Sequence, residues 1–169
     1  MWHWPVGNFS PVPIPPSKGS FAFQRRYHRH EGVDLYTPFH TPVYAVESGK
    51  VVGIEVLTGP DANPPSPWWH STGGLLVEGD SGVVLYGELS IGHLNILWTP
   101  GASIDEGVLV GYTERVVREE NGRPSCMLHL ELYPHGVKKS EEFGRQLDPT
   151  NKLLEAQKSR YKQTFVTRE

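Results

Sequence analysis

The clearest pattern in the chain is the alternation of leucine with other residues in the segment 127–133. Alternate residues of an extended strand point to opposite faces, so one face carries the leucines Leu128, Leu130 and Leu132. The other face carries Met127, His129 and Glu131. We therefore expect a strand whose leucine face packs in the core. Its opposite face presents His129, with Glu131 placed to orient the imidazole ring.

Several further runs of β-branched and apolar residues are separated by turn-forming residues, a pattern typical of short strands. They fall within the ranges 41–53, 75–77, 83–89 and 108–117. Ser48-Gly49 divides the first range, the segment 78–82 predicts a hairpin, and Asn121-Gly122 predicts a turn before the leucine strand. The pattern indicates a single, mainly β domain with antiparallel pairing.

The two ends of the chain differ from the central β region, residues 30–148. Residues 1–29 are rich in proline, which predicts an irregular lead-in packed on the β domain. Residues 149–169 carry the strongest helix signal, because Asp148 suits an N-cap and Pro149 suits a first helical position. We expect one C-terminal helix that extends to Lys162 and is followed by a tail.

One long connection, residues 58–74, contains four prolines and the pair Trp68-Trp69. Loops of this length without secondary structure are uncommon in compact domains and are often functional. Two interpretations stay open. The tryptophans line a binding groove, or they fold back on the core as part of a surface insertion.

Composition narrows the classes of partner. The 169 residues carry a formal net charge of -3, and the basic cluster at 25–29 is short, so nucleic-acid binding is not expected. No apolar stretch approaches the length of a membrane span, and no secretory signal is visible at the N-terminus. The single cysteine, Cys126, excludes an intrachain disulfide. The sequence by itself favours a cytoplasmic protein.

The segment His30–Asp34 offers an imidazole and a carboxylate, two groups that bind zinc. In a straight strand these two residues share a face but lie about 13 Å apart, so the backbone must bend to bring both to one ion. Gly32 lies midway and allows such a bend. Taken alone, the pair also fits an ordinary histidine and aspartate in a surface loop.

Together with the leucine strand, these residues belong to an ordered series of motifs. The series reads Trp4-Pro5-Val6, His30-x-Gly32-x-Asp34-Leu35, Thr41-Pro42-Val43-Tyr44-Ala45, Gly49-Lys50-Val51-Val52, Tyr86-Gly87-Glu88-Leu89, Gly107-Val108-Leu109-Val110-Gly111, Leu128-His129-Leu130-Glu131 and Leu147-Asp148-Pro149. In this order the chain resembles the lysostaphin-like family of zinc metallopeptidases, which mostly cut peptide cross-links in bacterial cell walls. The resemblance covers about residues 4–155 and implies a curved antiparallel sheet with a groove.

The resemblance implies that His30, Asp34 and His129 hold a zinc ion, with a water molecule at the fourth position. Family members use two further histidines, one in a Tyr-x-His-Leu segment and one at the start of His-x-His. Here these positions carry Glu88 and Met127. A thioether neither takes nor gives a proton at neutral pH, and a carboxylate stabilises an oxyanion only when it is protonated.

Three interpretations of Glu88 stay open. It acts as general base for a zinc-bound water, it binds zinc as a fourth ligand, or it is an ordinary charged residue beside the pocket. If Glu88 faces a metal ion, we expect its carboxylate to be ionised. The family's substrate groove would be lined here by Tyr86, Met127, Trp68 and Trp69.

Two functions are compatible with this sequence. The first is a zinc-binding module with reduced or absent peptidase activity that binds a peptide, glycan or protein, as some family members do. The second is an active zinc endopeptidase that cuts peptidoglycan-type cross-links with Glu88 as base. The replaced histidines favour the first, whereas the intact metal ligands fit both. The family mostly works outside the cytoplasm, which conflicts with the absence of a visible signal.

Overall fold

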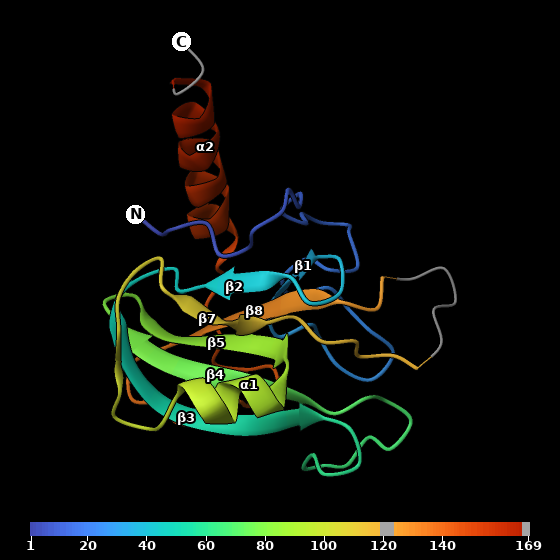
Figure 1. The fold of residues 1–169 in the computed structure, drawn as a ribbon. Helices are drawn as coiled ribbons and strands as arrows, with labels where there is room; N and C mark the ends of the chain where they lie inside the picture. Colours follow the sequence, from blue (N-terminus) through green and yellow to red (C-terminus); the bar gives the residue numbers. More distant parts are fainter. Residues whose placement is uncertain (119–123, 167–169) are drawn as a thin grey trace.

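The computed structural model describes residues 1–118 and 124–166, and within them two antiparallel sheets form the body of the protein (Figure 1). The predicted turn at Asn121-Gly122 lies outside the described residues. The elements are β1 (Val33–Tyr36), β2 (Pro42–Tyr44), β3 (Gly49–Thr58), β4 (Thr72–Gly79), β5 (Gly82–Leu89), α1 (Ile91–Leu97), β6 (Ser103–Ile104), β7 (Leu109–Tyr112), β8 (Met127–Tyr133) and α2 (Thr150–Val166).

The larger sheet has the strand order β1-β8-β5-β4-β3-β6, and its neighbouring strands pair antiparallel. Strands β2 and β7 form a second, two-stranded sheet. The predicted hairpin is present as β4 and β5, where Gly79 pairs with Gly82 across a two-residue turn. The mainly β fold expected from the sequence is confirmed. No helix among the described residues is long and apolar enough to span a membrane.

The main core lies on the leucine face of β8. Leu128, Leu130 and Leu132 are almost fully buried there. They belong to one apolar cluster with residues of the N-terminal segment, the small sheet and both helices, including Trp2, Trp4, Val6, Val43, Val110, Leu94, Leu153 and Ala156. Two tryptophans of the proline-rich segment are therefore part of the core.

The opposite face of the large sheet carries a second, smaller cluster. It contains Leu76, Val83, Leu85, Tyr133 and Val137. His129 and Glu131 alternate with the leucines of β8 and therefore lie on this second face, in line with Tyr133. The face thus has an apolar part around Tyr133 and a polar part around His129.

The C-terminal helix begins where the sequence predicts and ends a turn later. The Asp148 carboxylate accepts a hydrogen bond of 2.9 Å from the Thr150 amide, as an N-cap does. Leu153 anchors the first half of α2 in the core, and Arg160 donates to the Val6 and Gly7 carbonyls. The helix stands away from the strands, with the N-terminal segment beside its first turns (Figure 1).

Two local features differ from the sequence-based expectation. The short helix α1 was not predicted, because its seven residues bury only Leu94 and show no helical periodicity. The connection predicted at 58–74 is shorter, since Thr58 belongs to β3 and β4 begins at Thr72. Its irregular part is the segment 59–71.

Candidate metal centre

Three side chains from distant parts of the sequence meet at the junction of β1 and β8. Asp34 pairs directly with His129 across the two strands, and His30 precedes β1. Gly32 makes this junction possible by close approach, because a Cβ atom there would lie 2.2 Å from the Leu130 carbonyl oxygen. The chain therefore passes close to β8 and turns His30 and Asp34 toward the same point.

The atoms that face one another are all possible metal ligands. Nε2 of His30 lies 3.1 Å from Oδ1 of Asp34 and 3.2 Å from Nδ1 of His129. Nδ1 of His129 lies 2.7 Å from the same Asp34 oxygen. His30 and Asp34 are buried, and the His129 side chain is 13% exposed. The three predicted ligands are thus brought together in a nearly closed site.

Each of the three side chains also makes a hydrogen bond directed away from this point. Nδ1 of His30 donates to the Ser20 carbonyl at 2.9 Å, and Nε2 of His129 donates to Glu131 at 2.8 Å. The second oxygen of Asp34 accepts a bond of 3.1 Å from Arg25. Since each neutral imidazole has one N–H, these bonds leave the lone pairs of His30 Nε2 and His129 Nδ1 facing inward.

Three inward lone pairs within about 3 Å repel one another unless a positive group lies between them. Without a metal, a proton serves this purpose. Burial lowers the pKa of His129, but hydrogen bonds and charges from Asp34 and Glu131 outweigh it and hold this pKa well above its usual range. Burial would raise the pKa of Asp34, yet its bonds to His129 and His30 keep it well below its usual range.

The donor set fits a zinc ion. A tetrahedral ion with bonds of about 2.0–2.1 Å separates its ligand atoms by about 3.3 Å. The observed separations of 2.7–3.2 Å need only a small expansion to match it. A metal-binding histidine typically donates its other N–H to a carbonyl or carboxylate, as His30 and His129 do here.

Glu88 reaches the metal-centre face through a β-bulge. Two residues of β5, Gly87 and Glu88, lie opposite a single residue of β4, and Glu88 has a φ of 65°. Its carboxylate accepts a hydrogen bond of 2.6 Å from Thr72. Regular alternation would have placed Glu88 on the same face as Tyr86, within the main core.

Glu88 is electrostatically linked to two of the three proposed ligands, His129 and Asp34, but it is not grouped with them. It belongs to neither group of His, Asp and Glu side chains, among the described residues, whose donor atoms all lie within 4.8 Å of one another. Burial raises the pKa of Glu88, the His129 charge and Thr72 lower it, and the Asp34 and Glu131 charges raise it, with a net increase. The structure thus gives no support to a fourth-ligand role, and the expectation of an ionised Glu88 facing a metal ion stays a prediction.

Tyr86 does not line an open groove. Its side chain is fully buried in the main core, and its hydroxyl accepts a hydrogen bond of 2.9 Å from the Val46 amide. The prediction for Tyr86 is therefore wrong, because the bulge separates the face of Tyr86 from that of Glu88. Met127 is half-buried at the start of β8, opposite Tyr36.

Trp68 and Trp69 are 64% and 37% exposed and do not fold back on the core. The segment 59–71 is attached to the strand-like stretch before β8, through a hydrogen bond of 2.8 Å from the His70 amide to the Val116 carbonyl. This attachment keeps the tryptophans at the end of the sheet where β5 ends and β8 begins. Their role in a groove remains a prediction.

Four residues that support the site were not identified from the sequence. Ser20 and Arg25 lie in the irregular lead-in, where no periodic pattern marks them. Thr72 and Tyr133 are ordinary strand residues by pattern, yet Thr72 bonds to Glu88 and the Tyr133 hydroxyl donates to Glu131. Only the alternation of Tyr133 with Glu131 could have suggested one of these contacts.

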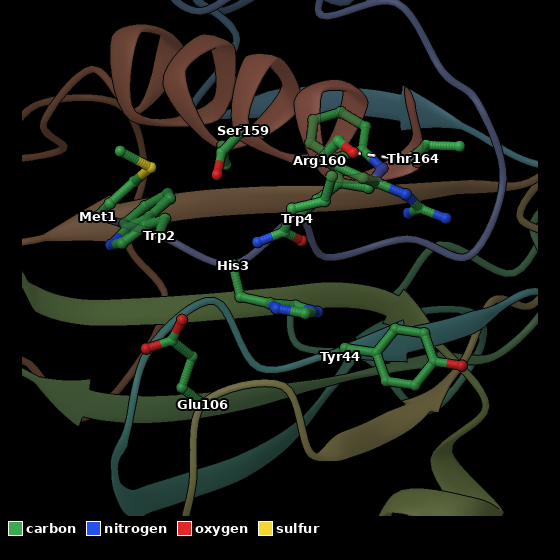
Figure 2. Close-up of a pocket in the computed structure, with 11 residues that line it drawn as sticks. Met1, Trp2, His3, Trp4, Tyr44, Glu106, Ser159, Arg160 and Thr164 are labelled. Atoms are coloured by element: carbon green, nitrogen blue, oxygen red, sulfur yellow. Dashed lines mark hydrogen bonds between the residues drawn. The ribbon is translucent and has the colours of Figure 1, made fainter. Parts of the chain in front are cut away.

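A separate cavity of about 570 Å³ lies away from the metal centre, between the N-terminal segment and α2 (Figure 2). Its lining includes Trp2, His3, Trp4, Tyr44, Glu106 and Arg160. The guanidinium of Arg160 is already used by the Val6 and Gly7 carbonyls. The cavity thus has aromatic walls and one arginine, Arg160, whose hydrogen bonds attach α2 to the N-terminal segment.

Comparison with known proteins identifies the fold. No protein-family profile matches the chain, and no curated protein matches it. Among solved structures, CbpA from L. salivarius REN has a TM-score of 0.57 and 20% identity over 92% of this chain and 96% of its own. The catalytic domain of the antimicrobial peptidase lysostaphin from Staphylococcus simulans has a TM-score of 0.54 and 19% identity, over 86% of this chain and 92% of its own.

A protein from Pseudomonas aeruginosa assigned to peptidase M23 is also similar, with a TM-score of 0.54 and 19% identity over 90% of this chain. The chain spans 50% of the length of that protein. At these identities the comparisons establish a shared fold, that of M23 peptidase and lysostaphin catalytic domains.

Proposed function

We propose that this protein is a zinc-binding domain that binds a peptide, glycan or protein segment at its metal centre and has little or no peptidase activity. The observation that supports the metal is the convergence of three lone pairs, from His30, Asp34 and His129, each fixed by an outward hydrogen bond. The observation that supports binding over cleavage is the chemistry of Glu88 and Met127, which the resemblance aligns with the family's two assisting histidines.

The chain's own residues have distinct tasks in this proposal. A bound zinc ion would supply Lewis acidity toward a ligand carbonyl or water. His30, Asp34 and His129 hold it, while Ser20 and Glu131 fix the two rings. Met127 offers only a thioether, so it moves no proton. Losing one positioned proton donor or acceptor costs about 10²- to 10⁴-fold in rate, and here two imidazoles are absent.

A second candidate function is an active zinc endopeptidase that cuts peptidoglycan-type cross-links. One observation favours it. The Glu88 carboxylate lies on the metal-centre face, held by Thr72 and within electrostatic reach of His129. In this alternative Glu88 is the general base that takes a proton from the attacking water.

Metal binding is tested by measuring zinc content and affinity. Protein prepared without chelator should carry about one zinc per chain, as a three-ligand site predicts. His129→Ala and Asp34→Asn should lose the ion. His135→Ala removes a histidine whose side chain is 59% exposed, and should leave zinc content unchanged. Wild-type protein that gains no zinc on titration would rule out the proposed site.

Cleavage of pentaglycine and of cell-wall peptides separates the two functions. We expect weak or no wild-type cleavage, and a gain when Glu88 and Met127 are both replaced by histidine. Robust wild-type cleavage that is lost in Glu88→Ala would favour the endopeptidase. Robust cleavage that survives Glu88→Ala would contradict both assignments of Glu88.

A further inference from the structure

Among the carboxylates at the metal centre, one oxygen atom of Glu88 accepts no hydrogen bond from a described residue. Asp34 uses one oxygen toward His30 and His129 and the other toward Arg25. Glu131 accepts from His129 with one oxygen and from the Tyr133 hydroxyl with the other. Glu88 accepts from Thr72 with one oxygen, and no described residue donates to the other.

Glu88 is held in this orientation by a chain of buried hydroxyls. Thr72 donates to Glu88 at 2.6 Å, and the Thr58 hydroxyl lies 2.7 Å from that of Thr72. Because each hydroxyl has one proton, Thr58 donates to Thr72 when Thr72 donates to Glu88, and the His70 carbonyl, 2.8 Å from the Thr58 hydroxyl, is the other possible acceptor of the Thr58 proton. Both threonines are at least nine-tenths buried. Two buried hydroxyls thus fix one carboxylate oxygen and leave the second one free.

The backbone of Glu88 is strained as well. A φ of 65° is unfavourable for a residue with a Cβ atom, and such residues cluster at functional sites. The strain places Glu88 on the metal-centre face instead of in the core beside Tyr86. A carboxylate that is oriented by buried threonines, and is placed by a strained bulge, is built to present its free oxygen to a ligand.

The partner of that oxygen must donate a hydrogen bond. The partly buried carboxylate lies beside two other carboxylates, so a positively charged donor satisfies both its hydrogen bond and its charge. Burial and the Asp34 and Glu131 charges raise the pKa of Glu88 by more than the His129 charge and the Thr72 hydrogen bond lower it.

We infer that the free oxygen of Glu88, positioned by Thr72 and Thr58, binds a primary ammonium group of the ligand. The inference rests on the proposed function, since it concerns the ligand bound at the same metal centre. A ligand of this class is a short peptide with a free N-terminus or with an amino group on a side chain. Thr72 and Thr58 are positioning residues, because they act through Glu88.

Three peptides distinguish these sources of the ammonium group. They are pentaglycine amide with a free N-terminus, its N-acetylated form, and an N-acetylated glycine peptide amide that ends in lysine. Binding to the full chain is measured by calorimetry, with and without zinc. The wild type should bind at least one of the two amine-bearing peptides about tenfold more tightly than the acetylated control, as a charge-assisted hydrogen bond predicts.

Substitutions test whether Glu88 causes the preference for amine-bearing peptides. Glu88→Gln keeps the shape of the side chain but removes its charge, and should abolish the preference for the amine. Thr72→Val should weaken the preference, and Thr72→Ser should restore it, because serine keeps the donating hydroxyl. Glu155→Gln changes an exposed carboxylate on α2 and should leave the preference intact.

Equal affinity for all three peptides, no binding of any of them, or a preference that survives Glu88→Gln would overturn the inference. Zinc titration of the same samples keeps the two hypotheses apart. Stoichiometric zinc binding without an amine preference contradicts only the role of Glu88. An amine preference in protein that binds no zinc contradicts the metal centre and leaves the role of Glu88 standing.

Discussion

At the scale of single residues, the metal centre depends on bonds that orient its ligands. Glu131 holds the His129 ring through Nε2 and is itself held by Tyr133. Replacing Glu131 by Gln should lower zinc affinity by about 10- to 100-fold, the usual effect of losing such an orienting carboxylate. Competition with a chelator of known affinity measures the change. Unchanged affinity would show that the His129 ring is oriented by other means.

The pH dependence of stability tests the electrostatics of the same residues in the metal-free protein. The lowered pKa of Asp34 adds stability above its unfolded value of 3.8, which is lost as the pH falls through the folded value. The raised pKa of His129 adds stability below 6.5, which is lost as the pH rises through the folded value. The free energy of unfolding should therefore be highest between these limits.

Denaturant unfolding at a series of pH values measures this profile. With saturating zinc, the decline at high pH should disappear, because His129 then binds the ion through Nδ1 and carries no extra proton. His129→Gln should remove the same decline without zinc. If the metal-free wild type becomes steadily more stable from pH 6 to pH 9, the pKa of His129 is not raised in the folded protein.

The strain at Glu88 can be measured by comparing two substitutions that both remove the carboxylate. Glycine adopts a positive φ without penalty, whereas for alanine this conformation costs about 1–2 kcal/mol. The greater conformational freedom of glycine in the unfolded chain offsets part of this difference in stability. Glu88→Gly should therefore be more stable to denaturant than Glu88→Ala by up to about 1 kcal/mol. An alanine variant as stable as the glycine variant would mean that the backbone at residue 88 is relaxed.

At the scale of elements, the junction of β1 with β8 sets the geometry of the ligands. Gly32→Ala would place a Cβ atom 2.2 Å from the Leu130 carbonyl oxygen, so it should destabilise the fold by about 1–3 kcal/mol and weaken zinc binding. Gly92→Ala is the control, since its Cβ atom would have no neighbour within 4 Å and alanine favours the helix α1. Thermal unfolding and zinc titration report both effects.

Elements with strong alternation were predictable from the sequence, and those set by tertiary contacts were not. The strand β8 has the bounds that its leucine pattern predicts, and the hairpin of β4 and β5 follows from its glycines. The bulge at Glu88 breaks the alternation on which sequence reasoning depends, so the face of Tyr86 was misassigned. Ser20 and Arg25 reach the site from an irregular segment, whose path follows only from packing.

At the scale of the whole molecule, the N-terminal segment is part of the fold. Trp4 is only 4% exposed and packs in the main core, so Trp4→Ala should cost about 3–5 kcal/mol. Trp68→Ala removes a tryptophan that is 64% exposed and should change stability by less than about 0.5 kcal/mol. Denaturant titration of the two variants gives the comparison. Similar stability losses would mean that the N-terminal segment contributes no more than the exposed loop.

The cavity between the N-terminal segment and α2 has a practical consequence for handling the molecule. Met1 and Thr164 both line it, so the two ends of the described chain lie on one side of the protein. His129 projects from the opposite face of the sheet. A tether at either end should therefore fix the protein to a sensor surface with its metal centre directed toward the solution, where soluble ligands can reach it.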